Sequence, residues 1–329
     1  MTPLRVGIVG CGRFAQYYHV PTLLEDERMR LSAIFDPAPS DDLIPLAKAN
    51  AIALVPSLDE LLAPGRVDAV LVSSPHALHA EHVRAVLAAG RPILVDKPFV
   101  LTAEEARASA ATAAGARLVA GVAFNRRLDP GCLHASKLLA SGAIGPLRHV
   151  ETIQLGYPKS GWLTDPKLGG GGPFVGRGAH MADLIPWLTG QRPRSVVAQT
   201  RPGHPGRVDR GGWIDLDFEA FTCRMTCLDD GLDLWDEVRL FGDEGFIELR
   251  RPMGYPIGWE LVRLDKNGLE AERINADPAT GACTKDFVAA IRDCTPIACS
   301  FADAYASVRI IEAAYQSAAR GGGRVALDL

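Results

Sequence analysis

The sequence predicts two domains of different class: an α/β Rossmann domain with a doubly wound parallel sheet, followed by an α+β domain with a largely antiparallel open sheet. Three observations predict this arrangement. The 329 residues exceed one typical domain. Apolar strand-like segments alternate with helix-like segments early in the chain, whereas the later part is a succession of strands separated by turn residues. We place the domains at residues 1–122 and 123–329, and expect that the terminal helices can pack back on the first domain.

In the first domain, apolar segments with the composition of buried strands alternate with helical segments. The strand segments are Leu4–Val9, Arg30–Phe35, Ala69–Ser73, Ile93–Val95 and Leu118–Gly121. The helical segments are Phe14–Glu25, Leu43–Asn50, His79–Ala89 and Ala103–Ala114. Strands that are apolar throughout are typical of a parallel sheet covered by helices on both faces.

The second domain begins where this alternation stops. Its strand segments are Arg148–Leu155, Ser195–Arg201, Trp213–Glu219, Thr222–Leu228, Glu237–Phe241, Gly245–Arg250, Glu260–Asp265 and Glu270–Asn275. Turn residues such as Asn267-Gly268 separate several of them, which predicts antiparallel connections. Two helices, Lys285–Asp293 and Asp303–Ala319, carry apolar residues at helical spacing and are expected to pack against a domain face.

The first strand runs into a turn of the form Gly10-x-Gly12-x-x-Ala15. Gly10 permits the tight turn, Gly12 lets the backbone approach a pyrophosphate, and Ala15 keeps the following helix close to the strand. The helix N-terminus then offers N–H groups to the phosphates. We therefore predict a dinucleotide site here, with Arg13 and Phe14 among the residues that contact the cofactor.

Asp36 ends the second predicted strand. A carboxylate at this place accepts hydrogen bonds from both ribose hydroxyls and repels a 2′-phosphate, which favours NAD over NADP. The alternative is a local role in which Asp36 caps the turn before Pro37.

Polar residues follow the next two strands of the first domain, in Ser73-Ser74-Pro75 and in Asp96-Lys97-Pro98. Both lie at the carboxyl edge of a parallel sheet, where doubly wound folds bind ligands. A lysine there can hydrogen-bond a substrate hydroxyl and stabilise the alkoxide, or transfer a proton if its pKa is lowered. We predict that Lys97 is catalytic and that Ser74, Pro75, His79 and Lys97 itself contact the cofactor. A surface lysine in a loop is the alternative.

A glycine-rich run, Gly169–Gly172, precedes His180 and Asp183. Glycines suit a close approach of the backbone to a ligand. His180 and Asp183 share one face if a helix starts here. Histidine is the usual general acid or base near neutral pH, although a lone histidine can also be structural.

Together these residues resemble the glucose-fructose oxidoreductase / inositol dehydrogenase / MocA family of NAD(P)-dependent oxidoreductases. The motifs occur in order over nearly the whole chain: Gly10-x-Gly12-x-x-Ala15, His19, Pro21, Pro75-x-x-x-His79, Ala89-Gly90, Lys97-Pro98, Phe124-Asn125-Arg126-Arg127-x-Asp129-Pro130, His180-x-x-Asp183, Trp187 and Glu312-Ala313-Ala314-Tyr315-x-Ser317-Ala318. The resemblance implies hydride transfer between NAD(P) and a sugar, cyclitol or related polyol, with Lys97 and His180 at the reacting carbon. It also implies a homodimer or homotetramer formed through the second-domain sheet.

One position departs from the family pattern. The family usually carries an Asp four residues before the catalytic His, and this chain has Gly176 there. Three interpretations stay open: Lys97 and His180 suffice with water or substrate, Asp183 or another carboxylate compensates, or the protein is not a standard dehydrogenase. In the last case it is a dinucleotide-binding regulator without turnover, or a lyase or hydrolase that uses NAD transiently.

Four further residues are candidates for contacts with the substrate, besides Lys97 and His180. Arg177 can recognise a carboxylate or phosphate by a bidentate contact, and Arg126 adds positive charge. Trp162 can stack on a sugar ring. Asp183 completes the set. The alternative for the arginines is a salt bridge, and for Trp162 it is simple packing.

Composition excludes several other classes of protein. A net charge of −4 gives no electrostatic case for nucleic acid or for an anionic membrane. No apolar run approaches the roughly 18 residues of a membrane span, and the chain enters its first strand at once, without a signal peptide. A cytoplasmic location is expected. Neither the seven cysteines nor the three histidines at positions 76, 79 and 82 have metal-ligand spacing, so no metal is predicted.

Overall fold

The computed structural model describes residues 2–231, 233–251, 259–274 and 281–329, which fold into two compact units. The first unit comprises Met1–Asn125 and Thr280–Tyr305, and the second comprises Arg126–Ala279 and Ala306–Leu329. The predicted boundary after residue 122 thus lies near the first break between units. In addition, the described residues 281–305 group with the first unit rather than with the second.

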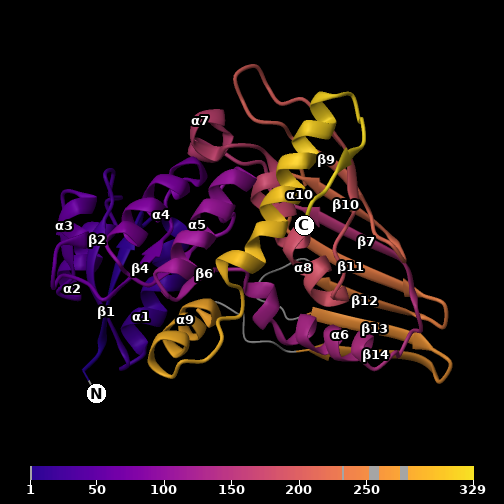
Figure 1. The fold of residues 1–329 in the computed structure, drawn as a ribbon, viewed down its shortest axis with the longest axis horizontal. Coiled ribbons are helices and arrows are strands. Elements are labelled where there is room, and N and C mark those ends of the chain that lie inside the picture. Colours follow the sequence, from indigo (N-terminus) through magenta and orange to yellow (C-terminus); the bar gives the residue numbers. More distant parts are fainter. Residues whose placement is uncertain (1, 232, 252–258, 275–280) are drawn as a thin grey trace. The chain divides into compact units, whose positions relative to one another are not determined.

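The first unit is built on a six-stranded parallel sheet with the order β3-β2-β1-β4-β5-β6 (Figure 1). Its strands are β1 (Leu4–Val9), β2 (Met29–Phe35), β3 (Ala53–Val55), β4 (Ala69–Val72), β5 (Ile93–Val95) and β6 (Ala120–Val122). The chain winds outward from β1 in one direction and from β4 in the other, so the predicted doubly wound class is confirmed. Strand β3 was not predicted, because three residues carry no measurable periodicity.

The helices of this unit are α1 (Val20–Glu25), α2 (Leu43–Ala49), α3 (Leu58–Leu62), α4 (His79–Ala88), α5 (Ala103–Gly115) and α9 (Ala282–Arg292). The predicted helix over residues 14–25 is divided: a π-helical turn, Ala15–His19, precedes α1. Helix α5 begins with a capping box in which the Thr102 and Glu105 side chains accept each other's backbone N–H groups. Strands β4 and β5 are buried throughout, and so is β1 except for the half-exposed Arg5, which places the core on both faces of the sheet.

The second unit contains a nine-stranded sheet with the order β14-β13-β12-β11-β7-β10-β9-β8-β15. Its strands are β7 (Leu147–Leu155), β8 (Ser195–Thr200), β9 (Gly211–Asp217), β10 (Thr222–Leu228), β11 (Trp235–Gly242), β12 (Phe246–Arg251), β13 (Trp259–Asp265), β14 (Gly268–Ile274) and β15 (Val325–Ala326). Strands β7 and β10 pair in parallel, while the other neighbours are antiparallel. The sheet is therefore mixed and largely antiparallel, as predicted.

The two faces of this sheet differ in burial. Along β7, Val150, Thr152 and Gln154 are buried, whereas Glu151 and Ile153 on the opposite face are half-exposed. Helices α6 (Pro130–Ala140) and α8 (Ala179–Thr189) pack together, and α6 lies against β12 and β13 (Figure 1). The long helix α10 (Phe301–Ala319) supplies its residues from 306 onward to this unit. Helix α6 was not predicted.

Helix α6 has clear local start signals that the sequence analysis missed. The Asp129 carboxylate accepts the backbone N–H of Gly131 at 2.9 Å, and Pro130 occupies the first helical position. Among the described residues, no helix is long and apolar enough to cross a membrane. All seven cysteines lie in the described ranges, and none forms a disulfide.

Candidate functional site

The glycine turn after β1 is held against the end of β4. Gly10 has a φ of +77°, and a Cβ atom there would lie 2.6 Å from Ser74 Cα and 2.7 Å from Ser74 N. No L-residue with a side chain fits this position without displacing the backbone. Gly12 is different, because an added Cβ would meet no atom within 4 Å. The turn thus leaves open space over Gly12, which fits the predicted approach of a pyrophosphate.

The segment that follows the turn presents both of its predicted contact residues to solvent. Ala15 is buried against the first unit, while Arg13 and Phe14 are exposed beside Gly12. The Phe14 ring packs at 4.6 Å from the ring of Tyr18. Arg13 and Phe14 are therefore accessible to a ligand at the turn.

Asp36 has the local role that the sequence analysis gave as an alternative. Its Oδ2 accepts the backbone N–H of Cys11 at 2.8 Å, and its Oδ1 accepts that of Ala38 at 2.9 Å. The side chain is half-exposed, and each carboxylate oxygen has a second lone pair. Asp36 therefore braces the glycine turn and keeps acceptor capacity, so its contact with a ribose stays a prediction.

A buried polar network lies at the carboxyl end of β5, directly before Lys97. Asp96 Oδ1 lies 2.9 Å from His19 Nε2, and Asp96 Oδ2 accepts the Ser73 hydroxyl. His19 Nδ1 in turn lies 2.9 Å from Thr284 Oγ1. Burial alone would raise the pKa of Asp96, but the charge and hydrogen bonds of His19 and Ser73 outweigh it and lower that pKa. The contact between His19 and Asp96 joins residues 77 positions apart and was not predicted from the sequence.

His79 links the segment after β4 to the segment after β5, next to Lys97. Its Nε2 lies 2.8 Å from the Ser74 carbonyl oxygen, and its Nδ1 lies 2.8 Å from the Pro98 carbonyl oxygen. The side chain is fully buried, and this burial lowers its pKa. His79 thus holds backbone in place, whereas Lys97 is half-buried and is the second residue after β5. The contact of His79 with a cofactor stays a prediction.

In the second unit, a wide helical turn precedes the predicted acid–base residue. A π-helical turn, Phe174–Gly178, leads into α8, where His180 is the second residue. The helix that would bring His180 and Asp183 to one face is therefore present. An added Cβ at Gly176 would meet no atom within 4 Å, so the position has room for a side chain that this chain does not supply.

The arginines that follow the first unit are paired with buried carboxylates. Arg127 Nε and Nη2 donate to Asp183 Oδ2 and Oδ1 at 2.9 and 2.7 Å. Arg126 Nη2 lies 3.0 Å from Asp236 Oδ2, and the Arg126 side chain is buried. The salt-bridge alternative is thus realised for Arg126. Asp183 is paired with Arg127, which fixes the first turns of α8 to the segment before α6.

Arg177 also has a carboxylate partner that the sequence analysis missed. Its Nε donates to Asp229 Oδ1 at 2.5 Å. The guanidinium passes over Gly156, where any Cβ atom would overlap it. Asp229 lies in the turn after β10, where an acidic residue is visible in the sequence. Its pairing with Arg177 was not predictable, because the two residues are 52 positions apart. Trp162, on a short helical turn after β7, has 37% of its surface exposed and is therefore accessible to a ligand.

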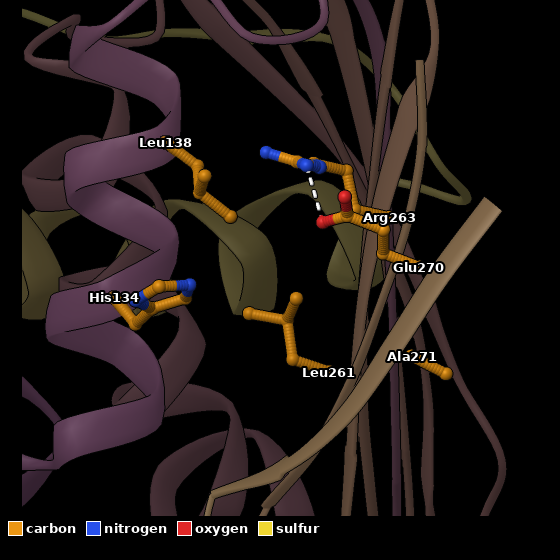
Figure 2. A pocket seen from close by; sticks show the side chains of 6 residues that line it. All are labelled: His134, Leu138, Leu261, Arg263, Glu270 and Ala271. Carbon is orange, nitrogen blue, oxygen red and sulfur yellow. Dashed lines mark hydrogen bonds and ion pairs between the residues drawn. The ribbon is translucent and has the colours of Figure 1, made fainter. Parts of the chain in front are cut away.

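A separate cavity lies away from these residues, between α6 and the strands β13 and β14 (Figure 2). It has a volume of about 310 Å³. The residues that line it are His134, Leu138, Leu261, Arg263, Glu270 and Ala271, and Arg263 pairs with Glu270 across its wall (Figure 2). None of the predicted site residues lines it. Within the described ranges, no three His, Cys, Asp or Glu residues are placed to hold a metal ion.

Comparisons with known proteins identify the class of both units. The model of the oxidoreductase family with an NAD-binding Rossmann fold matches residues 4–124, and the model of the GFO/IDH/MocA C-terminal domain matches residues 132–248. The chain therefore belongs to the GFO/IDH/MocA family and is an oxidoreductase. The resemblance stated from the motifs is confirmed.

Relatives and solved structures agree with this assignment. The chain is 31% identical to the rhizopine catabolism protein MocA of Rhizobium meliloti, with 97% of this chain and 96% of the relative covered. It is 32% identical to an inositol 2-dehydrogenase of Rhizobium meliloti over 59% of this chain and 58% of that protein. The fold matches aldose-aldose oxidoreductase from Caulobacter crescentus, complexed with glycerol, with a TM-score of 0.87, 23% identity and coverage of 99% and 100%. It also matches GenD2 from gentamicin A biosynthesis, in complex with NAD, with a TM-score of 0.85, 27% identity and coverage of 100% and 97%.

The two glycines of the turn predict opposite outcomes for one substitution. Gly10→Ala should lower the free energy of unfolding by about 1–3 kcal/mol, because the methyl group displaces the Ser74 backbone and φ is positive. Gly12→Ala should leave stability within about 0.5 kcal/mol, because its methyl group meets no protein atom. Its affinity for the dinucleotide should still fall about tenfold or more, or 1.4 kcal/mol.

Thermal unfolding and calorimetric titration with NAD measure both quantities on each variant. Wild-type affinity in the Gly12→Ala protein would show that the pyrophosphate does not lie over this turn.

Proposed function

We propose that the protein is an NAD-dependent dehydrogenase that transfers a hydride between nicotinamide and a hydroxyl of a sugar, cyclitol or related polyol. The observation that carries this proposal is the pairing of an open glycine turn with Lys97 at the carboxyl edge of the same parallel sheet. Full-length similarity to MocA and partial similarity to inositol 2-dehydrogenases support the substrate class.

The residues of the first unit fit a bound dinucleotide. The open space over Gly12 would hold the pyrophosphate, and the half-exposed Asp36 would accept hydrogen bonds from ribose. Ser74 and Pro75 follow β4 at the carboxyl edge, where the nicotinamide half would lie. When bound, the cofactor accepts or returns the hydride at its nicotinamide ring.

Lys97 and His180 would act on the substrate hydroxyl. The Lys97 ammonium would stabilise the alkoxide, or the neutral Lys97 amine would take the hydroxyl proton and become that ammonium. The Asp96 network would keep the end of β5 in place. His180 would transfer a proton or orient the hydroxyl. We propose that these two groups suffice without the usual Asp, whose position is Gly176.

The four further candidates for substrate contacts differ in their exposure to solvent. Trp162 is exposed enough to stack on a sugar ring. Arg177, beside Asp229, would recognise a charged or polar substituent. Arg126 and Asp183 are both buried in ion pairs, so we assign them a supporting role: they would hold the start of the second unit and helix α8 in place around the substrate.

Loss of the lysine tests this function directly. Lys97→Ala should lower kcat for polyol oxidation by about 10²–10⁴-fold, because one group both stabilises the alkoxide and moves the proton. Its affinity for NAD should stay within about twofold. Lys48→Ala, on the exposed surface of α2, is the matched control and should leave kcat unchanged.

The assay screens polyols, sugar acids and nucleotide sugars by NADH absorbance and by product analysis. Unchanged turnover in Lys97→Ala would refute its role. Product without net NADH would instead support a lyase or hydrolase that uses NAD transiently. Tight NAD binding with no product from any compound would support a regulator without turnover, the function that Gly176 favours.

The preference for NAD over NADP is tested at Asp36. Wild-type protein should bind NAD at least about tenfold more tightly than NADP, because the carboxylate repels a 2′-phosphate. Asp36→Asn keeps an oxygen acceptor for Cys11 N–H and removes the charge, so it should narrow this ratio. Titration of both proteins with both dinucleotides measures it. Equal affinities in the wild-type protein would contradict the assignment.

We further propose that the protein is a homodimer or homotetramer assembled through the open face of the second-unit sheet. Opposite charges alternate across that face: Arg224 pairs with Asp215 at 2.7 and 2.6 Å, and Arg239 pairs with Glu248 at 3.1 Å and with Glu151 at 3.5 Å. A surface with alternating charges can complement a second copy of itself. The half-exposed Trp213, Trp235 and Phe241 lie on strands of the same sheet. A cytoplasmic location stays a prediction.

A charge placed on this face should break the assembly. Ile153→Asp, at the centre of the open face, should yield monomers in sedimentation velocity, since an unpaired carboxylate is costly in an interface. Ile44→Asp, on exposed α2 of the first unit, is the matched control and should sediment as the wild type does. A monomeric wild-type protein, or an unchanged Ile153→Asp assembly, would exclude this interface.

A further inference from the structure

One face of helix α10 packs along residues 172–179, the segment directly before His180. Ser307, Ile311 and Tyr315 are spaced four residues apart, so they form a single stripe along the helix. Tyr315 contacts Gly172, Ile311 lies 3.4 Å from the position of a Cβ at Gly178, and Ser307 contacts Ala179. All of these residues belong to the second unit.

The Tyr315 end of the stripe is fixed by three hydrogen bonds. The Tyr315 hydroxyl donates to Asp209 Oδ2 at 2.8 Å and accepts the backbone N–H of Gly172 at 2.9 Å. The same N–H also lies 3.0 Å from Asp209 Oδ2. Asp209 is held in turn, because its Oδ1 accepts the N–H of Gly211 at 2.8 Å. Burial and the Asp209 carboxylate raise the pKa of Tyr315 well above its usual value, which keeps the donor proton in place.

The glycine-rich run has the shape that these contacts need. A Cβ at Gly171 would lie 2.6 Å from Val175 Cγ2 and 2.7 Å from the Tyr315 hydroxyl oxygen. A Cβ at Gly172 would overlap the Asp209 backbone carbonyl. Gly171 and Gly172 are therefore required by contacts within the protein. From the sequence, these glycines were interpreted as allowing the approach of a ligand.

The Ser307 end fixes the residue directly before His180. The buried Ser307 hydroxyl donates to the carbonyl oxygen of Ala179 at 3.0 Å. Between the two fixed ends lies the π-helical turn Phe174–Gly178, a wide and less regular helix than the α-helix that follows it. The contacts of Tyr315 and Ser307 hold the two sides of this turn, and so the direction in which α8 starts.

We propose that Tyr315, Asp209 and Ser307 are positioning residues that set the orientation of His180 by holding both ends of residues 172–179. They act through the backbone and need not touch the substrate. Small displacements are costly in catalysis, since a shift of about 1 Å in a reacting group can cost about 10²-fold in rate. This inference rests on the proposed function for its kinetic consequence, but its structural content can be measured separately.

Tyr315→Phe removes one hydroxyl and keeps the ring that packs against Phe174. It should lower kcat about tenfold, the equivalent of one lost hydrogen bond of about 1.4 kcal/mol. The KM for the polyol and the affinity for NAD should stay within about twofold. Ser307→Ala removes the contact at the other end and should give the same pattern, which keeps the test valid if one variant folds poorly.

Tyr305→Phe is the matched control on the same helix. Its hydroxyl accepts a hydrogen bond from Arg107 at 2.6 Å and belongs to the first unit. Because this hydrogen bond is exposed, Tyr305→Phe should lose little stability and should show no change in kcat. If Tyr315→Phe and Ser307→Ala match this control in kcat, or if they change KM alone, the positioning role is wrong.

The second readout does not need turnover. Nuclear magnetic resonance of protein labelled at histidine gives the ring signals of His180, which are identified by their loss in His180→Gln. Tyr315→Phe should shift these signals, because the imidazole meets altered surroundings, and Tyr305→Phe should not. If the wild-type protein oxidises no polyol, the proposed function fails and this measurement still decides the inference. Unchanged His180 signals in Tyr315→Phe would overturn it.

Discussion

The close approach of Gly10 to the backbone of Ser74 is the constraint on which the first unit depends. A positive φ and the absence of a side chain allow the turn after β1 to touch the end of β4. The Ser74 carbonyl then lies against His79, whose other ring nitrogen lies against the Pro98 carbonyl. A set of contacts through the Ser74 backbone and the His79 side chain thus runs from the glycine turn to the carbonyl of Pro98, the residue after Lys97.

In the second unit, ion pairs with little exposure to solvent hold the segments near His180 in place. The Arg127–Asp183 pair joins α8 to the segment before α6, and the Arg126–Asp236 pair joins that segment to β11. Removing such charges from water is costly, and the cost is offset only by good geometry and further hydrogen bonds. The two short distances in the Arg127–Asp183 pair meet that requirement. Helix α8, which carries His180, therefore has a defined orientation within its unit.

The departure at Gly176 has a physical context in the structure. The position has open space, so packing does not exclude the carboxylate that the family usually carries there. The neighbouring Arg177 is paired with Asp229, a carboxylate from the turn after β10. The two groups proposed to act on the substrate, Lys97 and His180, are both present in this chain. Gly176 therefore does not conflict with the family assignment.

The sequence by itself determined the alternation of strands and helices, the glycine turn and the doubly wound class, because each depends on short-range spacing. It also determined the family, because a series of short motifs occurs in order along nearly the whole chain. Only the tertiary structure decided which residues meet across long separations. The parallel pairing of β7 with β10, the contact of His19 with Asp96, the Arg127–Asp183 pair and the contact of Tyr315 with Asp209 all join segments far apart in the chain. No local period encodes such contacts, because they form only when the sheets and helices have packed. Asp36 was identified from the sequence by its place after β2. Its hydrogen bond to the Cys11 N–H of the glycine turn is visible only in the folded structure.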